Sequence, residues 1–447
     1  MRKFFIAFAI ITLLISCTSR KSIDKPDMAE KVKQEFKHAW DSYKKYAWGH
    51  DALRPLGKTY HDWYGSSLLM TPVDAFDTMV LMGLTDEAAE AKALILENLS
   101  FDKDIDVQGF EINIRLLGGL LACYELDGDE RFLALAEDLG KRLLPLFNSP
   151  TGLPYRYVNL KTGATRDHLN NPAEIGTYIL EFGTLSKLTR NSIYYDKSKI
   201  ALFELNKRRS QIGLVGTIID VNTGQWQNTT SHISGMIDSY YEYLLKGWLL
   251  LGDEDCKRMW ESSIKAINTY MKHEVTSGLW YGQVDMHSGE RLSTKFGALD
   301  AFFPAVLALA DDFDTAAQLQ NSCFTMWNLH GIEPEQIDYS TMEVLYANYP
   351  LRPEIIESAY YLYHFTKDKK YLNMGRTFYD GLVKYCRTDA GYAALRSVVT
   401  KEQEDSMESF FLAETLKYLY LLFADESILN FDTVIFNTEA HPLKRRH

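Results

Sequence analysis

Residues 408–423 read ESFFLAETLKYLYLLF, and this run indicates a helix that is buried on nearly every side. A surface helix carries apolar residues on one face only, whereas here they surround the axis. Segments 238–252 (DSYYEYLLKGWLLLG) and 111–126 (EINIRLLGGLLACYEL) have the same character. Amphipathic segments alternate with them, as in 86–99 (DEAAEAKALILENL) and 130–147 (ERFLALAEDLGKRLLPLF). The sequence therefore predicts an all-α protein in which buried inner helices pair with amphipathic outer helices.

The buried helices recur at a regular spacing along the chain. Asp77 begins a series of first acidic residues, and the later members are separated by 63, 64, 62, 54 and 60 residues: Glu111, Glu174, Asp238, Asp300, Glu354 and Glu414. A helical hairpin with its loops occupies about this length, and repeats of hairpins form stacked or closed arrays. Seven such units predict an (α/α) barrel. Since helix pairs of this length are common and acids are frequent at helix starts, an unrelated helical stack is the alternative.

The composition is that of one large globular domain. Of 447 residues, 46% are hydrophobic and 24% are charged, which is enough for a substantial core. No linker divides the chain after residue 28, so residues 29–447 are expected to form a single domain. Short strand-like pieces occur only at 151–163 and 431–437. The net charge of −12 argues against a nucleic-acid partner, because phosphate binding needs a basic face.

The first residues are typical of an export signal. Arg2 and Lys3 precede an apolar run, and the LISC sequence at 14–17 resembles the lipobox of bacterial lipoproteins. We therefore expect residues 1–17 to be a lipoprotein signal peptide, Cys17 to be lipidated, and residues 18–28 to be a tether. The protein would be exported and held at the bacterial outer membrane by its lipid anchor only, periplasmic or surface-exposed. The alternative is a plain signal peptide with an incidental cysteine.

Two possible metal motifs fail on spacing. The remaining cysteines show no CxxC pattern, so a zinc site is not expected, and their apolar surroundings predict buried thiols with at most one disulfide: Cys123, Cys256, Cys323 and Cys386. Segment 102–113 (DKDIDVQGFEIN) begins like an EF-hand loop but lacks Gly at its sixth position and Glu at its twelfth.

Acidic residues occupy positions inside the buried helices where apolar residues are expected. They form pairs at i+4, i+3 and i+7, which place both carboxylates on one helix face: Asp238 with Glu242, Glu354 with Glu357, and Glu174 with Glu181. Burial makes such pairs costly unless a cation compensates them, and only Arg115 and Arg352 are obvious local cations. If the repeat is real, these acids meet at one end of the barrel. Such a pocket suits a hard cation, a hydroxyl-rich ligand and glycoside hydrolysis. Solvated helix starts or pairing with nearby lysines is the alternative for each single acid.

Residues 434–443 read VIFNTEAHPL, a strand that ends in a hydroxyl, a carboxylate and an imidazole. A fraying tail would need none of these groups. We interpret the segment as a plug whose polar tip, at Thr438, Glu439 and His441, is pushed into a site built elsewhere.

These segments together resemble the class I α-1,2-mannosidases of glycoside hydrolase family 47, from about residue 30 to residue 443. The resemblance rests on LMTPVDAFDTMVLMGL, FEINIRLLGGLLACYELDGD, NPAEIGTYILEFGTLSKLT, IDSYYEYLLKGWLLLGD, LRPEIIESAYYLYHFTKDKKYL, MESFFLAETLKYLYLLF and FNTEAHPL. It implies an (α/α)7 barrel plugged at one end by a C-terminal β-hairpin. It also implies a calcium ion (Ca2+) and an α-1,2-mannose-containing glycan as ligands.

The resemblance also implies roles for single residues. Thr438 is expected to be the direct protein ligand of calcium, and Glu354 the general base of an inverting hydrolysis. Glu111 and Asp238 are the other catalytic carboxylates, and which of them protonates the leaving group is left open. Phe410 matches an aromatic floor beneath the sugar. The full substrate-binding set is Arg115, Glu174, Glu181, Glu242, Arg352, Glu357, Phe410, Glu414 and Glu439.

One departure concerns the region 299–310. Ala298 and Ala301 stand where many eukaryotic members have a His and a disulfide-bonded Cys, so Cys323 is expected to be a free thiol. This region is similar to the degradation-enhancing branch of the same family, which leaves the substrate range open.

The leading prediction is a monomeric, calcium-dependent, inverting exo-α-1,2-mannosidase that acts on high-mannose glycans or mannans. The alternatives are a mannose-binding lectin on the same scaffold, or a different (α/α)-barrel glycosidase or lyase.

Overall fold

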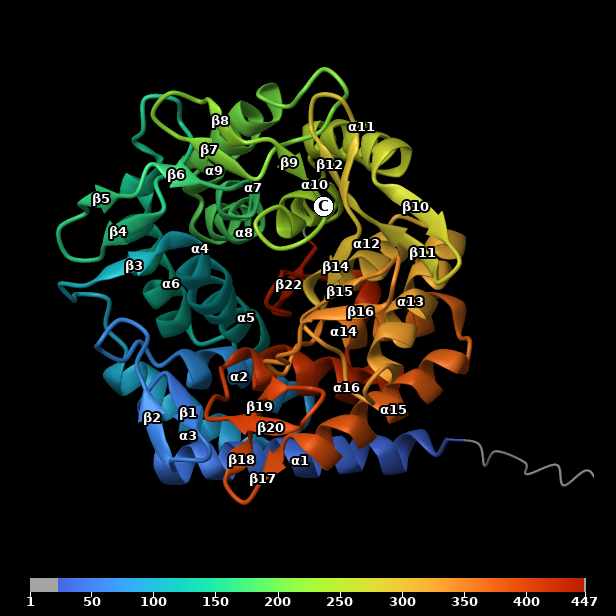
Figure 1. Ribbon diagram of the computed structural model, residues 1–447. Helices are drawn as coiled ribbons and strands as arrows, with labels where there is room; N and C mark the ends of the chain where they lie inside the picture. Colours follow the sequence, from blue (N-terminus) through green and yellow to red (C-terminus); the bar gives the residue numbers. More distant parts are fainter. Residues whose placement is uncertain (1–22, 446–447) are drawn as a thin grey trace, which may run out of the picture.

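The computed structural model describes residues 23–445, and this part of the chain is mostly helical, as predicted. The long helices are α1 (Lys25–Tyr46), α2 (Met70–Leu81), α3 (Thr85–Asn98), α5 (Gly118–Asp127), α6 (Glu130–Leu143), α8 (Ile179–Thr189), α9 (Ile193–Lys207), α10 (Asp238–Leu251), α11 (Glu254–Tyr270), α12 (Phe303–Leu309), α13 (Phe313–Asn328), α14 (Glu354–Thr366), α15 (Lys370–Tyr385) and α16 (Leu416–Phe423). They are arranged in a ring (Figure 1).

The helices alternate between an inner and an outer position. Inner helices contact one another in chain order, α2 with α5, α5 with α8, α8 with α10, α12 with α14, and α14 with α16. The π-helical turn η4 (Phe411–Thr415), which leads into α16, contacts α2, so the last inner helix meets the first. Each outer helix packs on an inner neighbour, and α1 packs on α16. Figure 1 shows the resulting ring.

Burial separates the two kinds of helix as the sequence pattern predicts. Every residue of α16 is buried, as befits a helix surrounded by protein. The outer helix α6 instead buries one stripe, formed by Phe132, Ala136, Leu139 and Leu143. This stripe follows the i, i+4, i+7 spacing of a helix with one apolar face.

The loops carry short strands that the sequence analysis largely missed. Within the described residues they form small sheets of two or three strands: β1 (Ala52–Arg54) with β2 (Thr59–His61); β3 (Asp106–Gln108), β4 (Tyr157–Asn159) and β5 (Thr165–Arg166); β6 (Leu169–Asn170), β7 (Ile218–Asp220) and β8 (Trp226–Asn228); β9 (Thr230–Ser231), β12 (Gln283–Asp285) and β13 (Arg291–Ser293); β10 (Lys272–Val275) with β11 (Gly278–Tyr281); β14 (Lys295–Gly297), β15 (Gln336–Asp338) and β16 (Glu343–Tyr346); β17 (Arg387–Thr388) with β18 (Gly391–Tyr392); β19 (Ala394–Ser397) with β20 (Glu402–Glu404); and β21 (Val434–Phe436) with β22 (Pro442–Lys444). Only β4 (Tyr157–Asn159) and β21 (Val434–Phe436) fall in the predicted strand-like pieces. Strands of two to four residues are too short to show the alternation that identifies a strand in a sequence. The all-α prediction is therefore corrected to a mostly helical fold.

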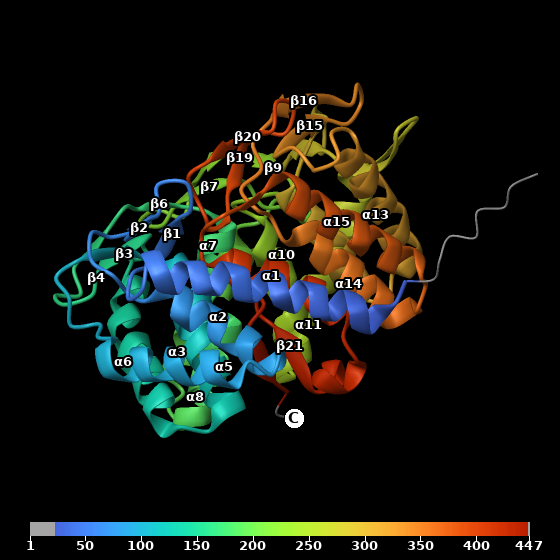
Figure 2. The same ribbon diagram turned by 90° about the horizontal axis from the view of Figure 1, so that it is seen from below.

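The last two strands enter the ring from the side opposite most of the other strands. β21 pairs antiparallel with β22 (Pro442–Lys444), with Ile435 opposite Leu443 and Phe436 opposite Pro442. In Figure 2 most of the other strands lie along the upper side of the molecule, whereas β21 lies on the lower side. β21 contacts α10 and β22 contacts α5, so the pair sits between inner helices. The turn between them, residues 437–441, is buried apart from Thr438 and reaches the centre of the ring.

The N-terminal boundary differs from the prediction. Helix α1 begins at Lys25, so residues 25–28, assigned to the tether, are its first turn. The Asp24 side chain caps this turn and Pro26 occupies an early helical position, where the missing N–H of proline costs nothing. The predicted signal peptide and Cys17 lie outside the described residues.

The described cysteines are all buried, as predicted, and all are free, including Cys323, which was expected to be a free thiol: Cys123, Cys256, Cys323 and Cys386. Between residues 23 and 445, no helix combines the length and the apolar character needed to cross a membrane.

Candidate active site

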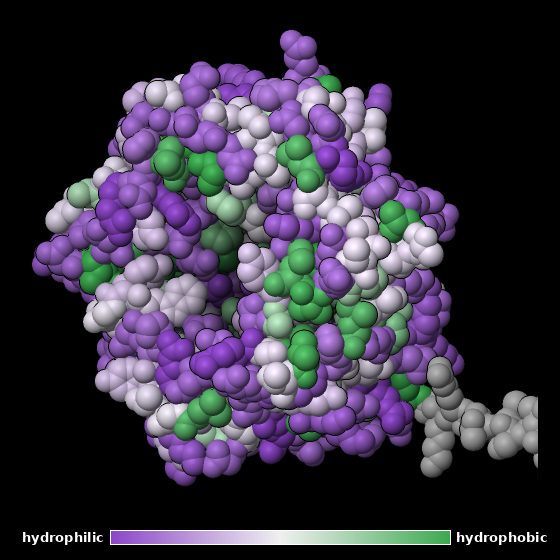
Figure 3. Space-filling model, viewed as in Figure 1, coloured by the Kyte–Doolittle hydropathy of each residue, from purple (hydrophilic) through white to green (hydrophobic). Residues whose placement is uncertain are grey.

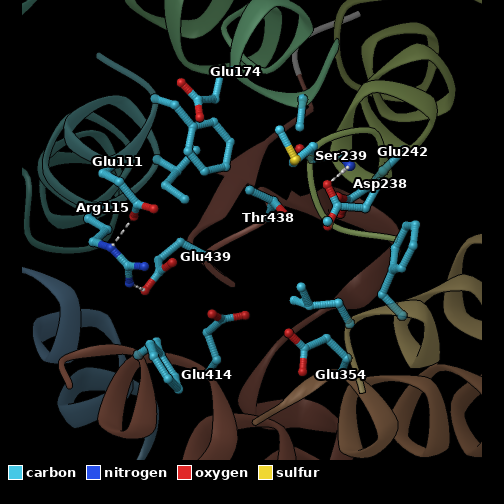
Figure 4. A pocket seen from close by; sticks show the side chains of 18 of the residues that line it. Glu111, Arg115, Glu174, Asp238, Ser239, Glu242, Glu354, Glu414, Thr438 and Glu439 are labelled. Carbon is cyan, nitrogen blue, oxygen red and sulfur yellow. Dashed lines mark hydrogen bonds and ion pairs between the residues drawn. The ribbon is translucent and has the colours of Figure 1, made fainter. Parts of the chain in front are cut away.

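A cavity of about 450 Å³ opens at the centre of the ring. Figure 3 shows it as a hollow in the face that carries most of the strands. Twelve of the thirteen residues predicted for catalysis, substrate or metal line it: Glu111, Arg115, Glu174, Asp238, Glu242, Arg352, Glu354, Glu357, Phe410, Glu414, Thr438 and Glu439. Acids that are spread over more than three hundred residues of sequence therefore meet in one place (Figure 4).

Helix starts place four of these acids. Asp238 is the first residue of α10 and Glu354 the first of α14, so both carboxylates sit where the helix dipole favours negative charge. Glu242 and Glu357 follow one turn later on the same faces, as the i+4 and i+3 spacings predict.

Arg115 and Glu414 lie on irregular turns that no periodicity predicts. Arg115 belongs to the π-helical turn η1 (Asn113–Leu117), which leads into α5, and Glu414 belongs to η4. A π turn inserts one residue into a helix and rotates the following side chains, and such turns are frequent at functional sites.

Arg115 connects acids from three parts of the chain. Its Nε donates to Glu111 Oε2 at 2.9 Å, its Nη1 forms a close ion pair with Glu439, and Asp74 Oδ2 lies 3.8 Å from Nη1. The guanidinium also lies over the rings of Trp63 (5.0 Å) and Phe410 (5.7 Å), a cation–π arrangement.

Asp238 occupies the opposite wall (Figure 4), and it forms no ion pair with a base between residues 23 and 445. Its Oδ1 accepts from the backbone N–H of Ser239 at 2.8 Å. Burial, reinforced by the charges of Glu242, Asp300 and Glu354, raises the pKa of Asp238 to about 8. Asp238 therefore keeps its proton near neutral pH.

Glu354 stands beside Arg352 without a close ion pair. Arg352 Nη1 is 4.0 Å from Glu354 Oε1, because the guanidinium binds Glu335 by two hydrogen bonds of 3.1 and 2.7 Å. Glu354 Oε2 is buried and has no hydrogen-bond partner in the described chain. Burial raises the pKa of Glu354 more than the positive charge of Arg352 lowers it, so the pKa is about 7.

Two further acids that line the cavity, Glu174 and Glu242, form ion pairs with basic residues that are not among the predicted site residues. Arg156 holds Glu174 with hydrogen bonds of 2.9 and 3.1 Å, and Lys246, buried one turn after Glu242, forms a close ion pair with it. The i+4 spacing of Glu242 and Lys246 was readable from the sequence. Both acids therefore line the cavity and are also paired with a nearby base.

At the end of the cavity that is formed by residues 437–441, the acidic side chains repel one another. Burial and neighbouring carboxylates raise the pKa of Glu414, and among the carboxylates Glu439 has the largest effect. Burial and Glu242 likewise raise the pKa of Glu357, against the opposing effect of Lys246. A cluster of this kind, with more acids than bases, would be stabilised by a bound cation.

The turn between β21 and β22 (residues 437–441), here called the tail turn, places Thr438 beside these acids (Figure 4). Asn437 shapes the turn, since its Oδ1 accepts from the backbone N–H groups of Glu439 (3.0 Å) and His441 (2.8 Å). Its Nδ2 donates to Glu181 Oε1 at 2.9 Å, and the Tyr243 hydroxyl accepts from the N–H of Thr438 at 3.2 Å. Thr438 is the one residue of the turn that is not buried.

Glu181 is the exception among the predicted residues. It does not line the cavity; it is fully buried behind it, where it accepts from Tyr243 (2.7 Å), Asn437 (2.9 Å) and Asn113 (3.1 Å). The i+7 spacing from Glu174 gave the correct face, but α8 begins only at Ile179 after a break in the helix, which carries Glu181 away from the opening. Its prediction as a sugar contact is corrected to a support for the tail turn.

A buried charge network also holds the turn, and the sequence analysis missed it. His441 lies between two aspartates of α2, with Nδ1 2.8 Å from Asp77 Oδ2 and Nε2 3.2 Å from Asp74 Oδ1. Lys417 binds Asp77 Oδ1 at 2.7 Å and donates to the carbonyl of Ala440 at 2.6 Å. Burial alone would lower the pKa of His441, but Asp77 and Asp74 raise it to about 9.

The donors around Thr438 are compatible with calcium. Within residues 23–445, no three His, Cys, Asp or Glu side chains cluster closely enough to hold a metal directly. Direct binding at this end would therefore use the oxygens of Thr438, with the nearby carboxylates holding water molecules. Oxygen ligands and several carboxylates are what calcium prefers.

Comparisons with known proteins identify the family of the chain. The model of Glycosyl hydrolase family 47 matches residues 35–445. The chain is 39% identical to ER degradation-enhancing alpha-mannosidase-like protein 2 of Mus musculus over 94% of this chain and 78% of that protein. It is 37% identical to Mannosyl-oligosaccharide 1,2-alpha-mannosidase IB of Homo sapiens, over 95% and 71%. The solved structure of an alpha-1,2-mannosidase from Trichoderma reesei superposes with a TM-score of 0.88 at 27% identity, covering 94% of this chain and 99% of that chain.

Proposed function

The chain belongs to glycosyl hydrolase family 47, and on that basis we propose how its cavity carries out hydrolysis: as a calcium-dependent, inverting exo-α-1,2-mannosidase. It is an enzyme of the mannosyl-oligosaccharide 1,2-α-mannosidase type, acting on high-mannose glycans. The observation that carries the mechanism is the convergence of Glu354, Asp238 and Glu111 on one cavity that the tail turn closes.

Glu354 acts as the general base. An inverting hydrolysis needs a carboxylate that takes a proton from water while that water attacks the anomeric carbon. The free, buried Oε2 of Glu354 is available for such a water, and Arg352 is close enough to favour the charged form without blocking it. As the water adds, the bond between the anomeric carbon and the glycosidic oxygen breaks.

Asp238 supplies the proton to the departing oxygen, directly or through a water. Its pKa of about 8 keeps it protonated at neutral pH, as a general acid requires. Glu111 is already bound to the Arg115 guanidinium, so we assign it to binding and orientation. The choice that the sequence left open thus falls on Asp238.

Thr438 would hold calcium directly, and Glu439, Glu414 and Glu357 would hold its water ligands. A calcium ion held there would act as a Lewis acid that polarises sugar hydroxyl groups. Arg115 keeps Glu439 in place, and Phe410 gives the sugar an apolar surface. Because the tail turn closes this end of the cavity, only a terminal sugar reaches it, which supports exo cleavage.

We propose the finer fold description together with this function. The alternating inner and outer helices support an (α/α)7 barrel, and the position of β21 and β22 supports its closure by a C-terminal β-hairpin.

We also propose that the chain is an exported bacterial lipoprotein anchored through Cys17, on the N-terminal sequence pattern alone. Incorporation of labelled palmitate into the intact chain, and its loss in Cys17→Ala, tests the anchor.

The test of the function uses α-1,2-mannobiose and the protein without residues 1–22. We expect mannose release that stops when a chelator removes calcium and returns when calcium is added. Proton NMR of the first product should show the β-anomer, the outcome of inversion. Glu354→Gln should bind the disaccharide without cleaving it, whereas a protein that binds but never releases mannose in its wild-type form would be a lectin.

A further inference from the structure

Asp300 is the one acid of the repeat series between Glu111 and Glu414 that does not line the active-site cavity. It lies in the 3₁₀ turn η3 (Leu299–Phe302), which leads into α12, and it is only 3% exposed. Between residues 23 and 445 it forms no ion pair with a base. A buried carboxyl without a cation costs free energy, and such groups are frequent at functional sites. Asp300 therefore indicates a function that the mechanism above does not include.

Asp300 connects η3 to two neighbouring backbone segments. Its Oδ2 accepts from the N–H of Gly297, at the end of β14, at 2.8 Å. The side chain of Ser234 also hydrogen-bonds this carboxyl. The carbonyl oxygen of Ser234 in turn accepts from the N–H of Asp238 at 3.0 Å. Ser234 therefore links Asp300 to the first residue of α10, which is the proposed general acid.

The turn that Asp300 holds, residues 234–237, has a strained backbone and packs closely on η3. Met236 has a φ of 76°, a left-handed conformation that is costly for a residue with a side chain and persists only where its surroundings enforce it. A Cβ on Gly235 would lie 2.8 Å from Leu299 Cδ1, so the turn is in direct contact with η3. Loss of the contacts from η3 would allow this turn to relax and the general acid to move.

The negative charge of Asp300 acts on both catalytic carboxyl groups. Burial raises the pKa of Asp300 to about 7, so it is mostly ionised at pH 8. In that form it raises the pKa of Asp238 and that of Glu354. A nearby negative charge favours the protonated form of a carboxyl, which is the form that a general acid needs.

Other titratable or charged groups face Asp300 and Asp238 from the surrounding elements: Glu242 on α10, Cys323 on α13, Glu335 before β15, and Arg352 and Glu354 around the start of α14. Glu335 raises the pKa of Asp300, and Glu242 raises that of Asp238. The guanidinium of Arg352 is bound to Glu335 by two hydrogen bonds. The thiol of Cys323 stays neutral, because burial raises its pKa. The surroundings of the general acid are therefore dominated by negative charge.

We propose that Asp300 is a positioning residue for the general acid: through Ser234 it fixes the turn from which α10 starts, and its negative charge keeps the proton on Asp238 until the glycosidic oxygen departs. The proposal rests on the function above, because it takes Asp238 as the proton donor. Asp300 acts without touching the sugar, which agrees with its position outside the cavity wall.

The test compares Asp300→Asn with the wild-type protein on α-1,2-mannobiose and on a mannoside whose activated leaving group departs without a proton. The amide keeps an oxygen for the N–H of Gly297 but carries no charge to bury, so the variant should fold. Removing the negative charge lowers the pKa of Asp238, so the alkaline fall of kcat/KM on the disaccharide should move by roughly 0.5–1 pH unit towards lower pH. This shift is a roughly three- to tenfold loss at pH 9. On the activated mannoside the loss at pH 9 should stay within about twofold.

Two further variants separate the charge of Asp300 from its contacts. Ser234→Ala should shift the alkaline fall in the same direction but by less, because loss of the hydrogen bond raises the pKa of Asp300 and leaves less of it ionised. Asp300→Ala removes charge and contacts together, so it should also lower kcat at the pH optimum by roughly tenfold or more. The matched control is Asp314→Asn, because Asp314 is exposed in the first turn of α13 and its profile should equal that of the wild type.

Two results would overturn the proposal: an alkaline fall in Asp300→Asn that coincides with that of the wild type, or equal losses on both mannosides. Failure of the wild-type protein to release mannose from the disaccharide would instead refute the proposed function. Thermal unfolding, with Asp314→Asn as the reference, shows whether each variant folds. If Asp300→Asn does not fold, Ser234→Ala decides the question, and a profile equal to that of the wild type would then overturn the proposal.

Discussion

Replacing His441 with alanine should destabilise the protein and weaken calcium binding together. The imidazole is fully buried between Asp74 and Asp77, so its removal leaves two carboxylates facing each other where water cannot solvate them. Lys417 still compensates Asp77, but Asp74 retains only Arg115 at 3.8 Å.

The size of the effect follows from the charge on His441. Its pKa rises from 6.5 to about 9, which corresponds to about 3 kcal/mol of favourable interaction in the folded state. Removing one partner from a buried ion pair generally costs about 3–5 kcal/mol, which agrees with this value. We therefore expect the free energy of unfolding at pH 6 to fall by about 3–5 kcal/mol.

The effect has a definite pH dependence. A group whose pKa is raised by folding contributes its full stability below the unfolded pKa, here 6.5, and loses it as the pH rises through the folded pKa, here about 9. The difference between wild type and variant should therefore be largest at pH 6 and shrink towards pH 10.

Urea unfolding without calcium, at a series of pH values, measures this difference, and titration calorimetry measures calcium binding. His168→Ala is the control, because the His168 side chain is 53% exposed. A variant within about 1 kcal/mol of wild type at pH 6, or a difference that grows with pH, would refute the reasoning.

Three other changes test the site. Glu354→Gln should lower kcat by roughly 10²–10⁴ while binding persists, because a general base supplies about that factor; calorimetry with the disaccharide checks that binding. As the pH increases, kcat/KM should rise through the pKa of Glu354, about 7, because the base loses its proton. It should then fall through the pKa of Asp238, about 8, because the acid loses its proton. Kinetics over pH 5–9 measure both changes, and an optimum near pH 4 would contradict them. Asp238→Asn should be inactive on α-1,2-mannobiose but active on a mannoside with an activated leaving group, because that group departs without a proton. In Thr438→Ala, calcium should no longer raise the melting temperature.

Much of the site could be predicted because acids inside apolar helices are anomalous in the sequence itself. The i+3 and i+4 spacings of Glu354 with Glu357 and of Asp238 with Glu242 needed only helix geometry to place each pair on one face. The repeat spacing then brought the pairs to the same end of the fold.

The parts that could not be predicted depend on contacts between distant residues or on local irregularity. Asp74 and His441 are 367 positions apart, and no periodicity relates them. The π turns that aim Arg115 and Glu414 add a residue without an obvious signal in composition. Glu181, in contrast, was predicted to line the cavity and does not. Its i+7 spacing from Glu174 was read correctly, but a break in the helix places it behind the cavity.

The tail hairpin also sets the order in which the site can mature. Residues 434–444 follow every helix of the ring in chain order, yet they hold Thr438 and Glu439 at the closed end of the cavity. A ring that assembles during translation, N-terminal parts first, would thus have its acids in place before the segment that closes it arrives. Chains that end before residue 434 should therefore be catalytically silent and less stable than the full chain, because Asp74, Asp77 and Glu181 lose their partners His441 and Asn437, and a synthetic peptide of the tail supplied in trans should restore both activity and stability.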